Sequence, residues 1–176
     1  MGAQDNLVVE DGTGVSGANT YITVDDFLTY IDNRGLSYSA GSDHDDIAAN
    51  LIKATDYIEG KRKRFQGDKT AAANALQFPR TDCYVDGTAL ESDEIPNILK
   101  NAQAQIAYDL DALSIDQAKP AIAASSKGDI IREKVGPIER HYDSTGDKNP
   151  NPEFQTAEDL LAPLYKQGHG INLVKS

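Results

Sequence analysis

Cysteine is almost absent from this chain of 176 residues, which has only Cys83. A single cysteine cannot form a disulfide within the chain, and it cannot supply a metal site built from several thiolates. One thiol without a disulfide framework is typical of proteins that assemble in a reducing compartment, such as the bacterial cytoplasm. No activating residue pair lies near Cys83 in the sequence, so we expect a structural or exposed thiol.

Long apolar runs are absent as well. No stretch approaches the roughly 20 apolar residues that a membrane-spanning helix needs. The first residues lack the basic segment followed by an apolar segment that marks a secretory signal. We therefore expect neither a membrane protein nor a secreted one. The hydrophobic share of 39% and the mean hydropathy of -0.50 predict one modest core with long loops, and this length suits a single domain.

Positive charge is scarce. The chain has 17 Lys and Arg against 28 Asp and Glu, which gives a formal net charge of -11. Non-specific binding to a phosphate backbone depends on basic contacts that release counterions, so this balance opposes such binding by the chain as a whole. Solubility is the simplest explanation for an acidic surface of this kind.

Helical patterns fill much of the remaining sequence. Thr23 is a suitable N-cap for a first helix over about residues 24–34. Apolar residues at helical spacing predict a second helix from about residue 43 to residue 64. Thr156 would cap a last short helix that runs through Tyr165. These helices lie far apart in the sequence, with polar and glycine-containing segments between them.

The strongest helical pattern follows Pro96, which suits the first turn of a helix. The apolar residues on its single face are Ile95, Ile98, Leu99, Ala102, Ile106, Leu110 and Leu113. Asp86-Gly87 predicts a small hairpin in the loop before this helix. The fold class that we predict is mainly α, a bundle of about four helices with short β elements, an extended arm over 130–142, a linker over 143–155 and a tail over 168–176.

Three short motifs suggest ligands, and each has a simpler explanation. Residues 12–17 match the G-x-G-x-x-G spacing of dinucleotide-binding loops, but neither a helix start nor a βαβ unit follows, so we expect a turn with positive φ at glycine and no cofactor. His44 lies among aspartates that suit a helix cap better than a metal. Residues 143–149 lack the final Glu of a calcium loop. No catalytic triad is legible, and we predict no enzyme.

The most informative segment is 130–142, where strand-forming residues and mixed charges surround a Gly-Pro break. Pro137 removes a backbone donor and confines the stretch to an edge, a bend or a partner contact. We predict an extended arm, not a helix. Its candidate contact residues are Arg132, Lys134, Val135, Gly136, Pro137, Ile138 and Tyr142.

This arm resembles the Lys/Arg-Glu-Lys-Val-Gly-x-x-x-x-x-Tyr element of bacteriophage head-tail connector (adaptor) proteins, the neck subunits beneath the portal ring. Other segments in the order of that family are VEDGTGV at 9–15, ANTYI at 18–22, LIKATDYI at 51–58, LQFPR at 76–80, IP at 95–96 and LLAPL at 160–164. The resemblance spans most of the chain. It implies a structural virion protein, assembled in the host cytoplasm, that joins the portal protein to a stopper or tail-completion protein.

The same resemblance implies a homo-oligomer, a dodecameric ring that extends the DNA channel. Genomic DNA would only pass through this ring, and an acidic wall would disfavour sticking. The tail over 168–176 is either a frayed terminus or a strand that adds to a partner sheet. The resemblance implies that the tail docks on the portal through Ile171, Asn172, Leu173, Val174 and Lys175.

One basic run, Lys61, Arg62, Lys63 and Arg64, precedes Phe65. Cations at a helix C-terminus explain this run without a ligand, and a charged contact with an acidic protein surface is a second use. Basic residues beside an aromatic can also hold single-stranded nucleic acid. Some members of the connector family are described as single-stranded-DNA-binding, primosome-like (DnaT-like) proteins. The alternative function is therefore a single-stranded-DNA-binding replication accessory protein, which predicts steeply salt-dependent binding through this run.

Overall fold

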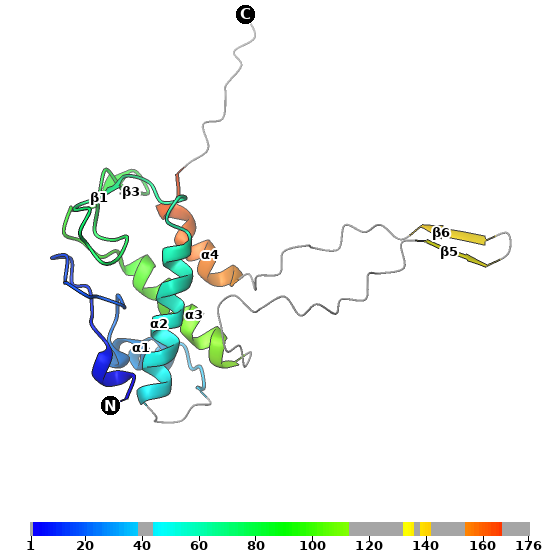
Figure 1. Ribbon diagram of the computed structural model, residues 1–176, viewed down its shortest axis with the longest axis horizontal. Helices are drawn as coiled ribbons and strands as arrows, with labels where there is room; N and C mark the ends of the chain where they lie inside the picture. The colour runs from blue at the N-terminus through cyan, green and yellow to red at the C-terminus, as the bar shows by residue number, and fades with distance from the viewer. Residues whose placement is uncertain (1, 39–43, 113–131, 136–137, 142–153, 167–176) are drawn as a thin grey trace, which may run out of the picture.

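The computed structural model describes residues 2–38, 44–112, 132–135, 138–141 and 154–166. The helices in these ranges are α1 (Val24–Asp32), α2 (His44–Gly60), α3 (Asn97–Ala112) and α4 (Gln155–Leu161), with short 3-10 turns η1 (Gln4–Asn6) and η2 (Ala162–Leu164). Helix α3 packs against both α2 and α4 (Figure 1). No helix in these ranges is both long and apolar enough to cross a membrane.

Three small antiparallel sheets of two strands each accompany these helices. They pair β1 (Asp68–Lys69) with β2 (Arg80–Thr81), β3 (Tyr84–Val85) with β4 (Thr88–Ala89), and β5 (Arg132–Val135) with β6 (Ile138–His141). Asp86 and Gly87, between β3 and β4, have φ of 51° and 80°. Two successive positive φ angles are those of a type I′ turn, so the predicted Asp86-Gly87 hairpin is confirmed.

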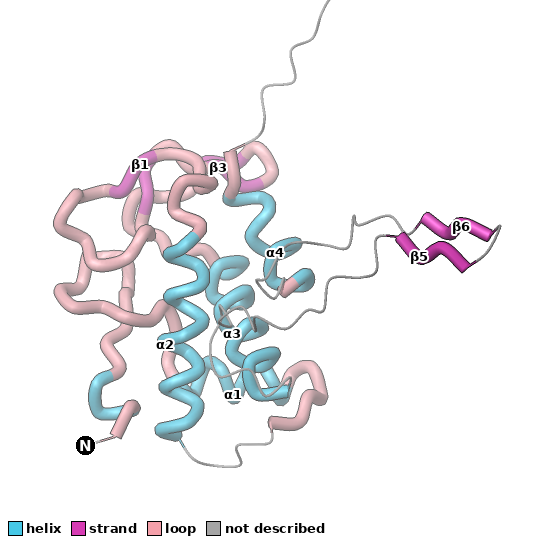
Figure 2. Tube along the Cα trace, turned by 45° about the vertical axis from the view of Figure 1, so that its right-hand side comes forward, coloured by secondary structure: helices cyan, strands magenta, loops and turns pink. Residues whose placement is uncertain are grey.

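The prediction of a mainly α bundle is wrong, because the structure is a mixed α+β arrangement. Between α2 and α3, residues 61–96 form turns and two of the small sheets and contain no helix. This segment still supplies core side chains, since Phe65, Leu76, Phe78 and Cys83 are all buried. Figure 2 shows these loops and strands covering one end of the helices. A core closed by loops and hairpins cannot be inferred from helical periodicity, which detects only the helices.

Two helices begin for different reasons, α1 at a side-chain cap and α4 at a packed aromatic ring. Thr23 caps α1 as predicted: its Oγ1 accepts from Asp26 N at 3.0 Å, while Thr23 N donates to Asp26 Oδ2 at 3.0 Å. The predicted Thr156 cap of α4 is wrong. Helix α4 begins at Gln155 after Phe154, which makes no side-chain cap and is buried edge-on against Tyr57 with ring centroids 5.0 Å apart. Packing of this aromatic ring therefore determines where the helix begins.

The predicted extended arm is a hairpin where the structure describes it. Its register places Glu133 opposite Arg140 and Lys134 opposite Glu139. Gly136, Pro137 and Tyr142 lie outside the described residues. The same holds for most of the linker and for the whole predicted docking tail, 171–175.

Candidate nucleic-acid interface

The four cations predicted as a charged contact lie just beyond the end of α2. The helix ends at Gly60 rather than near residue 64, and the chain continues in tight turns, with Lys61 N donating to Ile58 O at 2.9 Å and Arg64 N to Lys61 O at 2.8 Å. We call residues Lys61, Arg62, Lys63 and Arg64 the basic turn. Phe65, which follows, is fully buried and fixes the basic turn to the core.

A second segment brings one more cation to this place. Phe65 and Tyr165 form an antiparallel bridge, and Lys166 N donates to Arg64 O at 2.7 Å. Lys166 therefore lies beside the basic turn, and we call the basic turn together with Lys166 the basic end. The sequence analysis missed Lys166, because about a hundred residues separate it from Arg64 and no local pattern connects them.

One carboxylate neutralises part of the basic end. Glu158 forms ion pairs with Lys61 Nζ at 2.8 Å and with Arg64 NH1 at 3.0 Å. It also accepts hydrogen bonds from the hydroxyls of Tyr57 at 2.8 Å and Tyr165 at 3.1 Å. The two cations in turn lie over these two rings, Lys61 over Tyr57 and Arg64 over Tyr165. Half of the basic turn is thus held by the protein itself.

The charge of Glu158 is stabilised in the folded state. Burial alone would raise the pKa of this carboxyl, but hydrogen bonds from Lys61 and Tyr57 and the positive charge of Lys61 outweigh burial, so the pKa lies below its ordinary value. Glu158 is therefore an anion wherever the protein is folded at neutral pH, and it competes with any outside anion for Lys61 and Arg64.

The other cations of the basic end remain available. Arg62, Lys63 and Lys166 are exposed, and their side chains make no hydrogen bond or ion pair to a residue that the structure describes. The Arg64 side chain keeps 52% of its surface exposed despite its ion pair. Across 59–69, 80–86 and 158–166, seven Lys and Arg face six Asp and Glu. This end of the molecule therefore carries almost none of the excess negative charge.

An exposed aromatic side chain lies beside the basic end. Tyr84 in β3 is 49% exposed, more than any other large hydrophobic side chain in the described part of the chain. The side chain of Gln66 holds its backbone: Tyr84 N donates to Oε1 at 3.2 Å, and Nε2 donates to Tyr84 O at 2.7 Å. The same Nε2 donates to Pro163 O at 2.7 Å. Gln66 thus joins the strand of Tyr84 to the segment that leads to Lys166.

Buried polar groups hold this end of the molecule in place. Glu59 Oε1 accepts from Tyr21 OH at 2.6 Å and from Gln77 N at 3.0 Å, and burial raises the pKa of the Glu59 carboxyl. Arg80 is also buried and donates through Nε to Gln66 O at 2.7 Å and through NH2 to Gly67 O at 2.6 Å. These bonds fix the loop that carries Gln66.

The glycine loop at 12–17 serves a different purpose. Gly12 N and Gly14 N both donate to Glu10 Oε1, at 2.9 and 2.8 Å, so the chain's own carboxylate occupies the amides that a phosphate would need. Gly12, Gly14 and Gly17 all have positive φ, which confirms the predicted turn. His44 begins α2, and the described residues contain no cluster of His, Cys, Asp and Glu that could hold a metal ion.

Comparison with known proteins gives one match. A family model described as "Putative DnaT-like ssDNA binding protein" matches residues 6–175. The chain belongs to this family. No curated protein and no solved structure matches the chain. The matched range contains the basic turn, Tyr84 and Lys166.

Membership in the DnaT-like family corrects the interpretation of the chain as a virion neck subunit. The matched family is described by single-stranded DNA binding, and the match gives no support to a head-tail connector that binds a portal or extends a DNA channel. That interpretation is wrong on this finding, whereas the relatives described as DnaT-like were the informative part of the resemblance. The absence of catalysis and the association with further copies or tail proteins stay predictions.

Proposed function

We propose that this DnaT-like protein binds single-stranded DNA through its basic end, with Tyr84 as a surface on which bases stack. The observation that carries the proposal is the convergence of cations without carboxylate partners from two distant segments, next to an exposed aromatic ring. The family description supplies independent support. Such binding would suit a protein that assists DNA replication.

Local charge outweighs net charge in this proposal. The formal charge of -11 repels DNA from the molecule as a whole, but repulsion between exposed charges is largely screened beyond about 8 Å at physiological salt. Within that distance a phosphate at the basic end meets Arg62, Lys63 and Lys166, which form no ion pair with any carboxylate in the described ranges. The acidic remainder of the surface makes the basic end the favoured place for a strand to bind.

Tyr84 accounts for the preference for a single strand. The faces of unpaired bases are accessible to an aromatic side chain, whereas bases in a duplex are already stacked on one another. Stacking accepts every base, so we expect little dependence on base sequence. Duplex DNA of the same length should bind less tightly, since it can use the cations but not Tyr84.

Exchange of one lysine tests the proposed surface. Lys63→Gln removes an exposed cation from the basic end, and Lys53→Gln removes the same charge from the side of α2, where Lys53 bonds only Asn50 at 3.3 Å. Three available cations, Arg62, Lys63 and Lys166, predict a slope of about -2 for log K against log salt, and each one removed should reduce its magnitude by about 0.7. Fluorescence anisotropy of a labelled oligothymidine at several salt concentrations measures both slopes.

We expect the Lys63→Gln slope to be shallower and the Lys53→Gln slope to equal that of the parent protein. Equal slopes for the two variants would remove the basic end from the proposal. No measurable binding by the parent protein at low salt would remove the function itself.

A second substitution tests the stacking surface. Tyr84→Ala should weaken oligothymidine binding by about 1–3 kcal/mol, which is typical of the loss of one base-aromatic stack. Tyr84→Phe keeps the ring and serves as the matched control, so its affinity should be unchanged. Because Tyr84 is half exposed, neither variant should alter the fold, which far-ultraviolet circular dichroism checks. A Tyr84→Ala variant with unchanged affinity would show that no base stacks there.

A further inference from the structure

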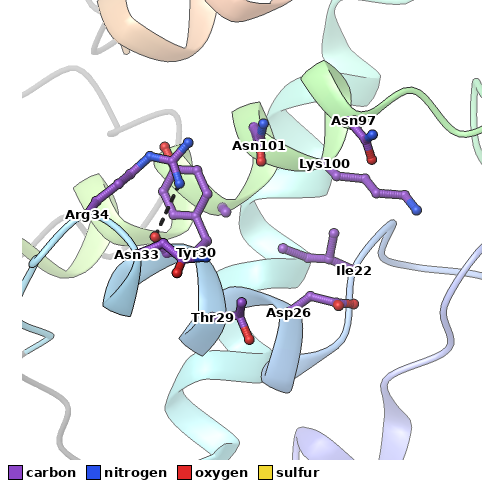
Figure 3. A pocket seen from close by; sticks show the side chains of 10 residues that line it. Ile22, Asp26, Thr29, Tyr30, Asn33, Arg34, Asn97, Lys100 and Asn101 are labelled. Atoms are coloured by element: carbon purple, nitrogen blue, oxygen red, sulfur yellow. Dashed lines mark hydrogen bonds between the residues drawn. The ribbon is translucent and has the colours of Figure 1, made fainter.

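A polar pocket of about 260 Å³ lies between α1 and the first half of α3, and the proposed function does not use it. Figure 3 shows its walls: Thr29 comes from α1, Asn33 caps the C-terminus of α1, and Asn97, Lys100 and Asn101 come from α3. Ile22 and Ala104 are buried and add apolar surface. This volume is just below the 300–1,000 Å³ of clefts that hold drug-sized ligands, so the pocket suits a small ligand.

The charge of this pocket is unusual for so acidic a chain. Two cations line it, Arg34 and Lys100, and neither forms an ion pair with a described residue. The one carboxylate in the lining, Asp26, is engaged in the cap of α1, where its Oδ2 accepts from Thr23 N and Thr23 Oγ1 at 3.0 and 2.8 Å. The unpaired charge in the pocket is positive, which favours an anion.

A flat surface forms one part of the wall. The Arg34 guanidinium lies 3.6 Å from the centroid of the Tyr30 ring, and its NH1 donates to Tyr30 O at 3.3 Å (Figure 3). The Tyr30 hydroxyl is occupied by Gln105, which accepts from it at 2.7 Å and donates to Asp109 at 2.8 Å. Arg34 is therefore a guanidinium plane held in place, and unpaired bases stack on such planes.

Three amide side chains also line the pocket. Asn33, Asn97 and Asn101 make no side-chain hydrogen bond to any residue in the described ranges. Each amide offers donors and an acceptor, which is the combination that pairs with the edge of a base. The asparagine amides can pair with the edge of a base, and the two cations without ion pairs can bind a phosphate. A ligand with both groups therefore fits the pocket.

We infer that the pocket between α1 and α3 binds one nucleotide, with its base on the Arg34 plane and its phosphate at Lys100, and with the asparagines of the lining available to the base edge. The nucleotide is either a free mononucleotide or one unit of a DNA strand. The second source rests on the proposed function, whereas the first does not.

Amide chemical shifts of ¹⁵N-labelled protein test the inference. Deoxyadenosine monophosphate should shift resonances of 26–34 and 97–104, deoxyadenosine should shift them more weakly, and inorganic phosphate should shift them least. Asn101→Ala should lower the affinity for the nucleotide by about fivefold, as expected from the loss of one hydrogen bond. This variant should still fold, because alanine favours helices. Lys100→Gln should bring the affinity close to that of the nucleoside. Lys53→Gln, the matched control, should leave it unchanged.

An oligothymidine distinguishes the two sources. Shifts of the pocket with both the mononucleotide and the oligonucleotide indicate a strand unit, and shifts with the mononucleotide alone indicate a free nucleotide. The Lys63→Gln variant should weaken oligonucleotide binding and leave mononucleotide binding unchanged, so failure of the basic end and failure of the pocket are separable. Absence of pocket shifts with either ligand would overturn the inference, as would equal shifts with phosphate alone.

Discussion

At the scale of single residues, Glu158 has two opposed effects. Its carboxylate gathers two cations and two tyrosine hydroxyls, which joins α4 to the end of α2. The same carboxylate occupies Lys61 and Arg64, which would otherwise be available to phosphate. Stability and DNA affinity should therefore change in opposite directions when this one charge is removed.

Glu158→Gln should lower the stability of the protein and strengthen its binding to single-stranded DNA. The loss of charge-assisted hydrogen bonds should lower the free energy of unfolding by about 2 kcal/mol. The half-exposed Arg64 pair adds little to this loss. The Tm should therefore fall by about 5 °C. Two released cations should steepen the salt slope by up to about 1.4. Calorimetry and anisotropy measure the two effects.

Asp159→Asn is the matched control. It removes the same charge at an exposed neighbour that bonds only Gln155, so its stability and DNA affinity should change little. Equal DNA affinity in the two variants would exclude Lys61 and Arg64 from the interface.

The pH dependence of stability follows from the same carboxylate. Because the folded-state pKa of Glu158 is depressed, its contribution is fully present above the unfolded value of about 4.3 and is lost as the pH falls through the folded value. The difference in Tm between the parent protein and Glu158→Gln should therefore be constant near neutral pH and should shrink in that acidic range. A difference that grows on acidification contradicts the sign of this shift.

At the scale of elements, the glycine loop shows how a nucleotide-binding pattern can be purely structural. Its amides bind Glu10, and its backbone lies against Asp93 and Asn74. The loop thus joins the beginning of the chain to the segment before α3. The spacing of glycines alone cannot distinguish such a turn from a phosphate loop, because both need positive φ and close backbone approach.

Two equivalent substitutions in this loop should have different effects. Gly12 and Gly17 have φ of 105° and 75°, so alanine is strained at both. At Gly12 an added Cβ would also collide with the carbonyl oxygen of Asp93, whereas at Gly17 it would meet nothing within 4 Å. Gly17→Ala should cost about 1 kcal/mol, and Gly12→Ala several-fold more. Urea unfolding measures both, and equal losses would mean that the loop moves away from Asp93 without cost.

At the scale of the whole molecule, charge is distributed unevenly. The segments around the basic end, 59–69, 80–86 and 158–166, are together close to neutral, and the excess of acidic residues lies elsewhere. Self-repulsion among the acidic residues destabilises the compact state, whereas attraction at the basic end would bind DNA, and salt screens both. Raising the salt from about 50 to 300 mM should therefore raise the Tm slightly while it weakens oligothymidine binding. Parallel thermal scans and anisotropy titrations check this, and a fall in both would contradict it.

Short-range patterns correctly predicted several features of the chain: the Thr23 cap, the Asp86-Gly87 turn and the approximate helices. These depend on hydrogen bonds and periodicity among residues a few positions apart, which are legible in the order of amino acids. The meeting of Glu158 with Lys61, the place of Lys166, and the mixed fold class were not legible. They follow from how Phe65, Phe154 and Tyr165 pack, and packing joins residues that are about a hundred positions apart.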